Sequence, residues 1–283
     1  MVEFGVEMLI SFAQIVDVVI KLIIKIILSV YMQFDSFFKI INNRFLLKLV
    51  TICIIYTVPI YSQDQYYAYC NSFTVICAQQ LDAGLINTNI GHRFYGPVSD
   101  GLDTLYGMDD GANVMLYAAY MLTDNDKVHV QRIRTDTDFQ LAYQRSVQIL
   151  HLPLFATVLV SANWYDDNGT DVFNGLSVFG LSWDYRFGQL HSNIGYDHYE
   201  SEMGVASALI FNVTDEWDIV FEGFSSSQSN DPALSIGGVY HTFGHRFKLG
   251  FHNSTAMGFR QLMHATTTKD WVFGFQIHRL LEW

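Results

Sequence analysis

The sequence predicts an all-β protein: a closed antiparallel transmembrane up-and-down β-barrel of about 12 strands, preceded by an N-terminal apolar helical extension and signal peptide. Three observations support this prediction. Apolar and polar residues alternate from residue 84 onward, nearly continuous apolar runs fill residues 1–62, and the chain ends in an aromatic-rich segment that closes on Trp283.

Composition and charge indicate a protein with a large apolar surface and argue against a nucleic-acid-binding protein. Half of the 283 residues are hydrophobic and 15% are aromatic, so the chain can bury or expose to lipid a large apolar surface. Residues 1–62 hold five of the 16 basic and four of the 28 acidic residues, which leaves the remainder with a net charge of −13. Such an acidic chain is not expected to bind nucleic acid.

The amino-terminal part carries the pattern of a secretory signal. In RFLLKLVTICIIYTVPIYSQ, basic Arg44 and Lys48 precede an apolar run from Leu49 to Val58, and Ser62 is a small residue before Gln63. A membrane anchor is the alternative, but the run is shorter than the ~20 residues that a spanning helix needs.

The division into segments follows from this pattern. Residues 1–31 form an apolar N-terminal extension, or lie upstream of a true start at Met32; the sequence does not choose between the two. We assign 32–62 to a signal peptide, 63–83 to a periplasmic N-terminal segment and 84–283 to an outer-membrane β-barrel.

The alternation has a period of two, which places neighbouring side chains on opposite faces of a strand. In the last strand, one face holds Trp271, Phe273, Phe275, Ile277, Leu281 and Trp283, and the other holds Gly274, Gln276, His278 and Glu282. The pattern recurs in FGLSWDYRF (179–187) and around Phe221 and Phe247. One face suits lipid and the other suits water.

About twelve candidate strands, each near the ~9–11 residues needed to cross a bilayer at a tilt, follow one another. They begin near residues 84, 112, 126, 138, 153, 175, 189, 204, 217, 233, 245 and 270. Tight connections alternate with longer ones at 95–111, 165–173, 225–232 and 253–269, as expected for short periplasmic turns and long outer loops. A soluble β-sandwich is the main alternative, although it rarely needs so many large aromatic residues.

Cys70 and Cys77 are the two cysteines of the predicted mature chain. A disulfide between them is possible in an oxidising compartment, and the sequence leaves the pairing open. Since no C-x-x-C spacing occurs, the sequence supports neither a redox motif nor a zinc site.

Two segments resemble a known family. IGHRFYGPVSDGLDTLYGMDDGANVMLYAAYMLTDND near the start of the predicted barrel, and DPALSIGGVYHTFGHRFKLGFHNSTAMGFRQLMHATT with the closing FGFQIHRLL, are similar to an uncharacterised family of predicted outer-membrane β-barrel proteins from Bacteroidota, a domain of unknown function. The resemblance spans roughly residues 84–283 and implies a fold and a location but no substrate. The long extension and the Glu282-Trp283 terminus depart from the family pattern.

A mixed set of polar and charged side chains is predicted to face the interior of the barrel, which we call the lumen. The set comprises Asn89, Arg93, Gln140, Gln144, Asp184, Arg186, His191, Asp197, Asp218, Glu222, Arg246 and Lys248. Such a set can line a water-filled pore, and opposite charges can equally pair and close it. We therefore expect a porin-like channel for small polar solutes, with a structural or scaffold barrel whose outer loops bind a partner as the alternative.

An outer-membrane lipid hydrolase is a weaker possibility. His191 and Ser192 are adjacent on a strand and point to opposite faces, so they cannot form an activating nucleophile–base hydrogen bond. His252 and Ser254 have a suitable spacing but no third orienting group. The acidic loop with Asp100, Asp103, Asp109 and Asp110 does not match a calcium-binding loop, so no catalytic residue, metal or cofactor is predicted.

The expected partners follow from the fold class. They are outer-membrane lipid and the barrel-assembly machinery, which would recognise the C-terminal strand ending at Trp283. The expected location is the outer membrane of a Gram-negative bacterium, and the oligomeric state is left open.

Overall fold

The computed structural model describes residues 70–281, except 79, 151, 186, 228–230, 243, 265–266 and 269. The predicted extension (1–31), the signal peptide (32–62) and the terminal Trp283 therefore lie outside the described residues. No helix in the described part of the chain is long and apolar enough to cross a membrane.

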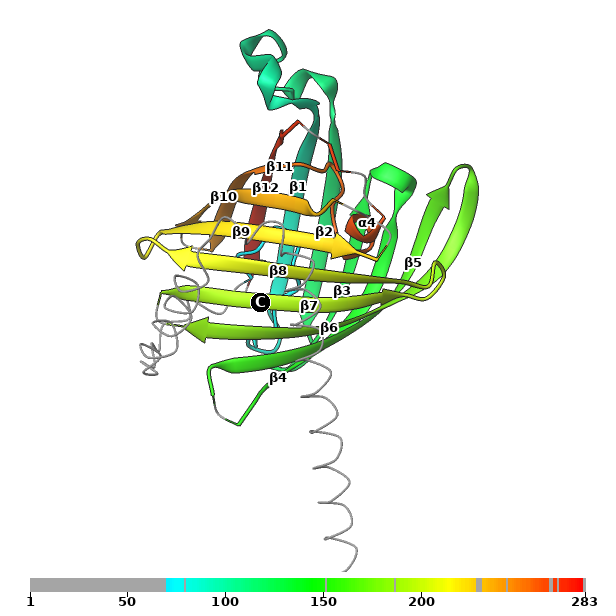
Figure 1. The fold of residues 1–283 in the computed structure, drawn as a ribbon. Helices are drawn as coiled ribbons and strands as arrows, with labels where there is room; N and C mark the ends of the chain where they lie inside the picture. Colours follow the sequence, from blue (N-terminus) through cyan, green and yellow to red (C-terminus); the bar gives the residue numbers. More distant parts are fainter. Residues whose placement is uncertain are drawn as a thin grey trace, which may run out of the picture. The chain divides into compact units, whose positions relative to one another are not determined.

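Twelve antiparallel strands close into one barrel, in which each strand pairs with its neighbours in sequence and the first pairs with the last (Figure 1). The strands are β1 (Ile86–Pro97), β2 (Ala112–Met121), β3 (Asp126–Ile133), β4 (Phe139–Gln148), β5 (Leu154–Asp167), β6 (Thr170–Tyr185), β7 (Gly188–Asp197), β8 (Glu202–Asn212), β9 (Trp217–Ser226), β10 (Ala233–Thr242), β11 (His245–His252) and β12 (Val272–Leu281). The prediction of a closed, up-and-down, antiparallel barrel of about twelve strands is confirmed.

Alternation along each strand sorts the side chains between the two faces of the wall. Phe221 is 42% exposed on the outside, whereas its neighbour Glu222 is 8% exposed and points into the lumen. Leu249 and Lys248 on β11 divide in the same way. An outer wall rich in exposed apolar residues is stable in hydrocarbon, where every backbone polar group of a closed barrel is already paired.

The two ends of the barrel differ in their connections. At one end, where β1 begins and β12 ends, the strands are joined by short connections; we call this the terminal end. At the other, the loop end, lie the segments 98–111, 134–138, 198–201, 227–232 and 253–271, with the short 3-10 helices η2 (Val98–Thr104), η3 (Met108–Asp110) and η4 (Thr135–Thr137).

The prediction of a long loop at 165–173 is wrong. β5 continues to Asp167 and β6 starts at Thr170, so only Asn168 and Gly169 form the turn. Both have positive φ, 53° and 85°, as the tight turn of a β-hairpin requires. The polar run at 166–171 interrupts the alternation and so predicts a loop, but the backbone pairing continues through it to the turn (Figure 1).

The segment 253–271 also differs from an ordinary outer loop, because its first part folds into the barrel. The short helix α4 (Phe259–Met263) has all five residues buried, and Met257 is buried just before it. We call residues 253–264 the cap. Phe259, Leu262 and Met263 pack in an apolar cluster with inward residues of β4, β5, β6, β8, β9 and β10.

Candidate functional site

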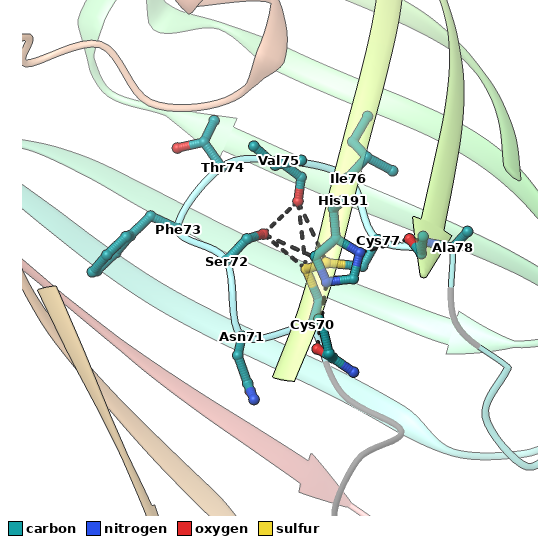
Figure 2. The surroundings of a disulfide bond; sticks show 12 residues. Cys70, Asn71, Ser72, Phe73, Thr74, Val75, Ile76, Cys77, Ala78 and His191 are labelled. Carbon is teal, nitrogen blue, oxygen red and sulfur yellow. Dashed lines mark hydrogen bonds between the residues drawn. A yellow bond between two sulfur atoms is a disulfide. The ribbon is translucent and has the colours of Figure 1, made fainter. Parts of the chain in front are cut away.

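The lumen contains a segment of the chain that precedes the barrel. Residues 70–78, which we call the plug, form a compact loop inside the wall, closed by a disulfide between Cys70 and Cys77 (Figure 2). Their Cα atoms are 5.4 Å apart. Residues 70–78 belong to the stretch 63–83, for which we predicted a periplasmic N-terminal segment ahead of the barrel.

Charged residues of the wall bind the backbone of the plug. The carboxylate of Glu222 on β9 accepts hydrogen bonds from the N–H groups of Phe73 and Thr74. From β11, the ammonium group of Lys248 donates to the carbonyl oxygens of Cys70, at 3.0 Å, and Ser72. Hydrogen bonds to ionised groups are the stronger ones, so this pair positions the plug firmly.

A second charged group holds Asn71. Its amide donates to Asp218 at 2.7 Å, and Arg246 donates to its side-chain oxygen at 2.8 Å. His241 lies 2.6 Å from the same Asp218 carboxylate. These residues come from β9, β10 and β11, so three adjacent strands converge on one plug side chain.

Polar residues on other strands complete the attachment. Asn193 on β7 exchanges two hydrogen bonds with the backbone of Ile76, at 2.7 and 2.8 Å. Gln144 on β4 donates to the carbonyl of Cys77 at 2.9 Å, and Gln276 on β12 donates to that of Phe73 at 3.0 Å. Because β4, β7 and β12 lie on different sides of the barrel, the plug spans the lumen.

Apolar contacts fill the space around the plug. Phe73 packs with the buried residues Ile210, Val220 and Val239, and its ring meets that of His252 edge-on at 5.0 Å between centroids. A Cβ atom on Gly250 would lie 2.6 Å from the Phe73 ring, so the absence of a side chain there makes room for the plug.

The cap closes the lumen from the loop end. Arg260 forms an ion pair with Asp138 at 2.9 Å, and its guanidinium lies 3.7 Å from the centre of the Tyr165 ring. His264 lies 3.1 Å from Asp197 and 2.9 Å from Glu202. Burial raises the pKa of Asp138, and the Arg260 charge acts against that rise.

Plug and cap also contact one another through the wall. Arg93 on β1 donates to the carbonyl oxygens of Ser254 and Ala256 in the cap, and to the hydroxyl of Thr74 in the plug, at 2.8 Å. A single buried guanidinium therefore bridges the two elements that occupy the lumen.

The structure places the sequence-predicted lumen residues as follows. Arg93, Gln144, Asp218, Glu222, Arg246 and Lys248 bind the plug directly, and His191 reaches it through Ser182, whose hydroxyl accepts from Ala78. Asp197 binds His264 of the cap. The other three contact wall residues: Gln140 donates a hydrogen bond to Ser161, and Asn89 donates to Gln276 at 3.5 Å. Half-buried Asp184 accepts a hydrogen bond from Gln189. Arg186 lies outside the described residues.

Sequence reasoning missed both the plug and the cap. The available signal was the pair of closely spaced cysteines just ahead of the first strand, together with two helix-compatible apolar residues, Leu262 and Met263, in a presumed outer loop. Neither shows where the segment goes, because insertion into a lumen depends on partners from six or more strands.

Histidine–serine pairs occur at three places in the described structure. His191 bonds to Ser182 at 2.6 Å inside the lumen, His252 to Ser235 at 2.7 Å, and His198 to Ser177 at 2.8 Å on the outer wall. The expected opposition of His191 and Ser192 holds, since Ser192 faces outward and bonds to Ser207. At the exposed pair, no described residue makes a second hydrogen bond to the imidazole ring of His198, so no group among the described residues orients that ring as a catalytic histidine requires.

A cavity of about 120 Å³ remains beside the plug, lined by the plug, by β1 to β6 and β12, and by Gly258 and Phe259 of the cap. Polar residues such as Asn87, Gln131, Gln144 and His278 share its wall with apolar ones such as Leu159 and Leu176. The described part of the lumen therefore holds the plug, the cap and, beside the plug, a cavity of mixed polar and apolar lining.

Comparison with known proteins gives a family and several similar folds. No curated protein matches the sequence. Among solved structures, the KdgM porin is 5% identical, with 69% of this chain and 98% of that chain covered and a TM-score of 0.48. The NanC porin is 9% identical (70% and 99% covered, TM-score 0.44), and the outer membrane phospholipase A from Escherichia coli is 7% identical (76% and 98% covered, TM-score 0.43).

At such low identities these likenesses leave transport and catalysis open. The sequence match to a family is more extensive, because it covers residues 50–175 and 180–281 and so includes the plug as well as nearly all of the barrel. The chain belongs to the family described as the membrane bound beta barrel domain (DUF5777).

Proposed function

We propose that this protein is an outer-membrane barrel that is closed at rest and passes small polar solutes when the plug gives way. The observation that carries the proposal is the binding of the plug backbone by Glu222 and Lys248. These charged residues lie on the face that would line a pore, and the plug occupies them. The expected porin-like channel would therefore be gated by the plug.

The strength of the attachment supports a closed resting state. Each hydrogen bond contributes ~0.5–1.5 kcal/mol net, and bonds to charged groups about 1.5–3 kcal/mol. Plug and wall are joined by many such bonds from strands on different sides of the barrel. Spontaneous release of the whole plug is therefore rare, whereas loss of a few anchors shifts the equilibrium measurably.

Conductance in planar lipid bilayers tests the gate. We expect few current steps from the intact protein and frequent steps from a variant that lacks residues 70–78. A smaller increase is expected for Asn193→Ala, which loses the two bonds to Ile76. The matched control is Ser192→Ala, since Ser192 is the outward neighbour on the same strand and should behave like the intact protein.

The folding of the plug-deleted barrel is verified by its resistance to unfolding in cold detergent. If this folded barrel shows no current steps, the channel function is rejected. The structural or scaffold alternative would then apply. One observation favours it: the β1–β2 loop exposes apolar residues at the loop end, including Leu102 at 73% and Leu105 at 49%. Such residues suit contact with a partner surface.

The proposed location rests on the apolar outer wall and on the family description. Cell fractionation should recover the protein with the outer membrane, with a mature amino terminus near Gln63. Recovery of intact residues 1–62 in an inner-membrane fraction would overturn both the location and the signal-peptide proposal.

A further inference from the structure

We infer that the cavity beside the plug is a binding site for a small monovalent anion, such as a halide or a short carboxylate, with Lys127 as its cation. Binding does not require the plug to open. Only its consequence, a preference of the open pore for anions, rests on the proposed function.

The wall of the cavity is built by one row of paired residues across five strands. His278 on β12 pairs with Asn89 on β1, which pairs with Tyr117 on β2; Tyr117 pairs with Gln131 on β3, and Gln131 with Gln140 on β4. The row below contains Asn87 and His129, and the next contains Lys127 and Gln144. The plug forms the opposite side through Ser72–Cys77.

Charge is distributed unevenly around this cavity. Among its described lining residues, Lys127 alone carries a full charge, and no carboxylate lines the space. Lys127 makes no ion pair with any described residue. In contrast, Arg93, Lys248 and Arg260 all have carbonyl or carboxylate partners.

Two histidines share the cavity wall with Lys127: His129, two residues away on β3, and His278 on β12. A cation in a space of low dielectric attracts a counter-ion more strongly than it would in water. An anion in the cavity would therefore compensate a charge that the protein leaves without a partner.

Unused hydrogen-bond donors supply the rest of the site. Within the described structure, the Asn87 and Gln131 amides and the Tyr117 hydroxyl line the cavity without a hydrogen bond to another residue. Each can donate a proton to an anion. The volume of about 120 Å³ has room for a halide or acetate together with water, and a single cation suits one negative charge better than two.

Bromide and formate are the probes, because both are small and monovalent but differ in shape. Crystals of the folded protein soaked in sodium bromide should show an anomalous peak in the cavity within hydrogen-bond distance of the Lys127 ammonium group. In detergent solution, titration calorimetry should show binding of both ions. Lys127→Gln should weaken it at least tenfold, and Tyr117→Phe should weaken it less.

Arg132→Gln is the matched control. Arg132 is exposed, lies on the same strand and carries the same charge, so its loss tests for a general electrostatic effect. Binding should be unchanged in this variant, and both variants should resist unfolding in cold detergent like the intact protein.

Three results would overturn the proposal: no bromide peak in the cavity, equal weakening by Lys127→Gln and Arg132→Gln, or tighter binding of sulfate than of bromide. Failure of the gate is distinguishable from failure of the site. If the plug-deleted barrel shows no current steps but still binds bromide, only the channel function is rejected. If it conducts but binds no bromide, only the anion site is rejected.

Discussion

The Glu222 carboxylate accepts a hydrogen bond from the backbone N–H of Thr74 at 3.2 Å, across 148 residues of sequence. The same carboxylate accepts from Phe73. A membrane-facing strand thus holds a segment that precedes the barrel, and one buried acidic side chain satisfies two backbone donors that would otherwise be unpaired in the lumen.

Replacing Glu222 with alanine should loosen the plug. The two amides lose their acceptor inside the lumen, which costs ~1–3 kcal/mol for each unsatisfied group. Hydrogen exchange at Phe73 and Thr74 should accelerate by at least tenfold, whereas exchange in the barrel strands should stay slow. Glu222→Gln, which keeps an acceptor oxygen, is the control, and exchange in Glu222→Ala as slow as in the intact protein would show that Glu222 does not anchor the plug.

Phe221 tests the opposite face of the same strand. Phe221→Arg should destabilise the barrel in lipid vesicles by ~2–4 kcal/mol, because a charged side chain would enter hydrocarbon. Glu222→Gln should leave insertion nearly intact, since residue 222 faces the lumen. Folding yield into vesicles measures both, and equal tolerance of the two substitutions would mean that the faces are misassigned.

The Cys70–Cys77 disulfide should limit the freedom of the released plug. Closing a loop of this length restricts the unfolded segment by about 2–3 kcal/mol. The double variant Cys70→Ser/Cys77→Ser should therefore keep a folded barrel but expose residues 70–78 to added protease. Cleavage no faster than in the oxidised protein would show that the wall contacts alone hold the plug. Reduction of the intact protein should reproduce the effect of the double variant.

Arg260→Met should detach the cap in a pH-dependent manner. Burial raises the pKa of Asp138 above its ordinary value of 3.8, so the folded state binds that proton more tightly than the unfolded state does. The contribution of Asp138 to stability is then greatest at low pH and declines as pH rises through the folded-state pKa. Without Arg260 the carboxylate is buried and unpaired at neutral pH, a loss of about 3–5 kcal/mol.

Thermal unfolding between pH 4 and pH 8 measures this change. The deficit of Arg260→Met relative to the intact protein should shrink as the pH falls and Asp138 takes up a proton. In the double variant Arg260→Met/Asp138→Asn, the deficit should no longer depend on pH. A deficit that grows on acidification would contradict the assignment of Asp138 as the partner.

The sequence by itself determined the class of fold and the two faces of the wall. Alternation such as Phe221-Glu222 and Lys248-Leu249 is a local property, and in a strand it translates directly into outward and inward positions. The number of strands follows in the same way, because lipid demands a closed barrel with segments of a set length. Two predicted loops differ from the structure. At 165–173 a polar run at 166–171 hides the continuing strands, and part of 253–269 folds into the barrel.

Only the tertiary structure decided what the inward residues do. From sequence, Arg93, Glu222 and Lys248 are equally suited to line water, to pair with one another or to bind another segment. They bind residues 70–78 and the cap because barrel closure brings β1, β9 and β11 around one space that must be filled. The tertiary structure likewise leaves Lys127 without an ion-pair partner among the described residues. The sequence does not show this, because contacts between residues far apart in the chain produce no periodic pattern.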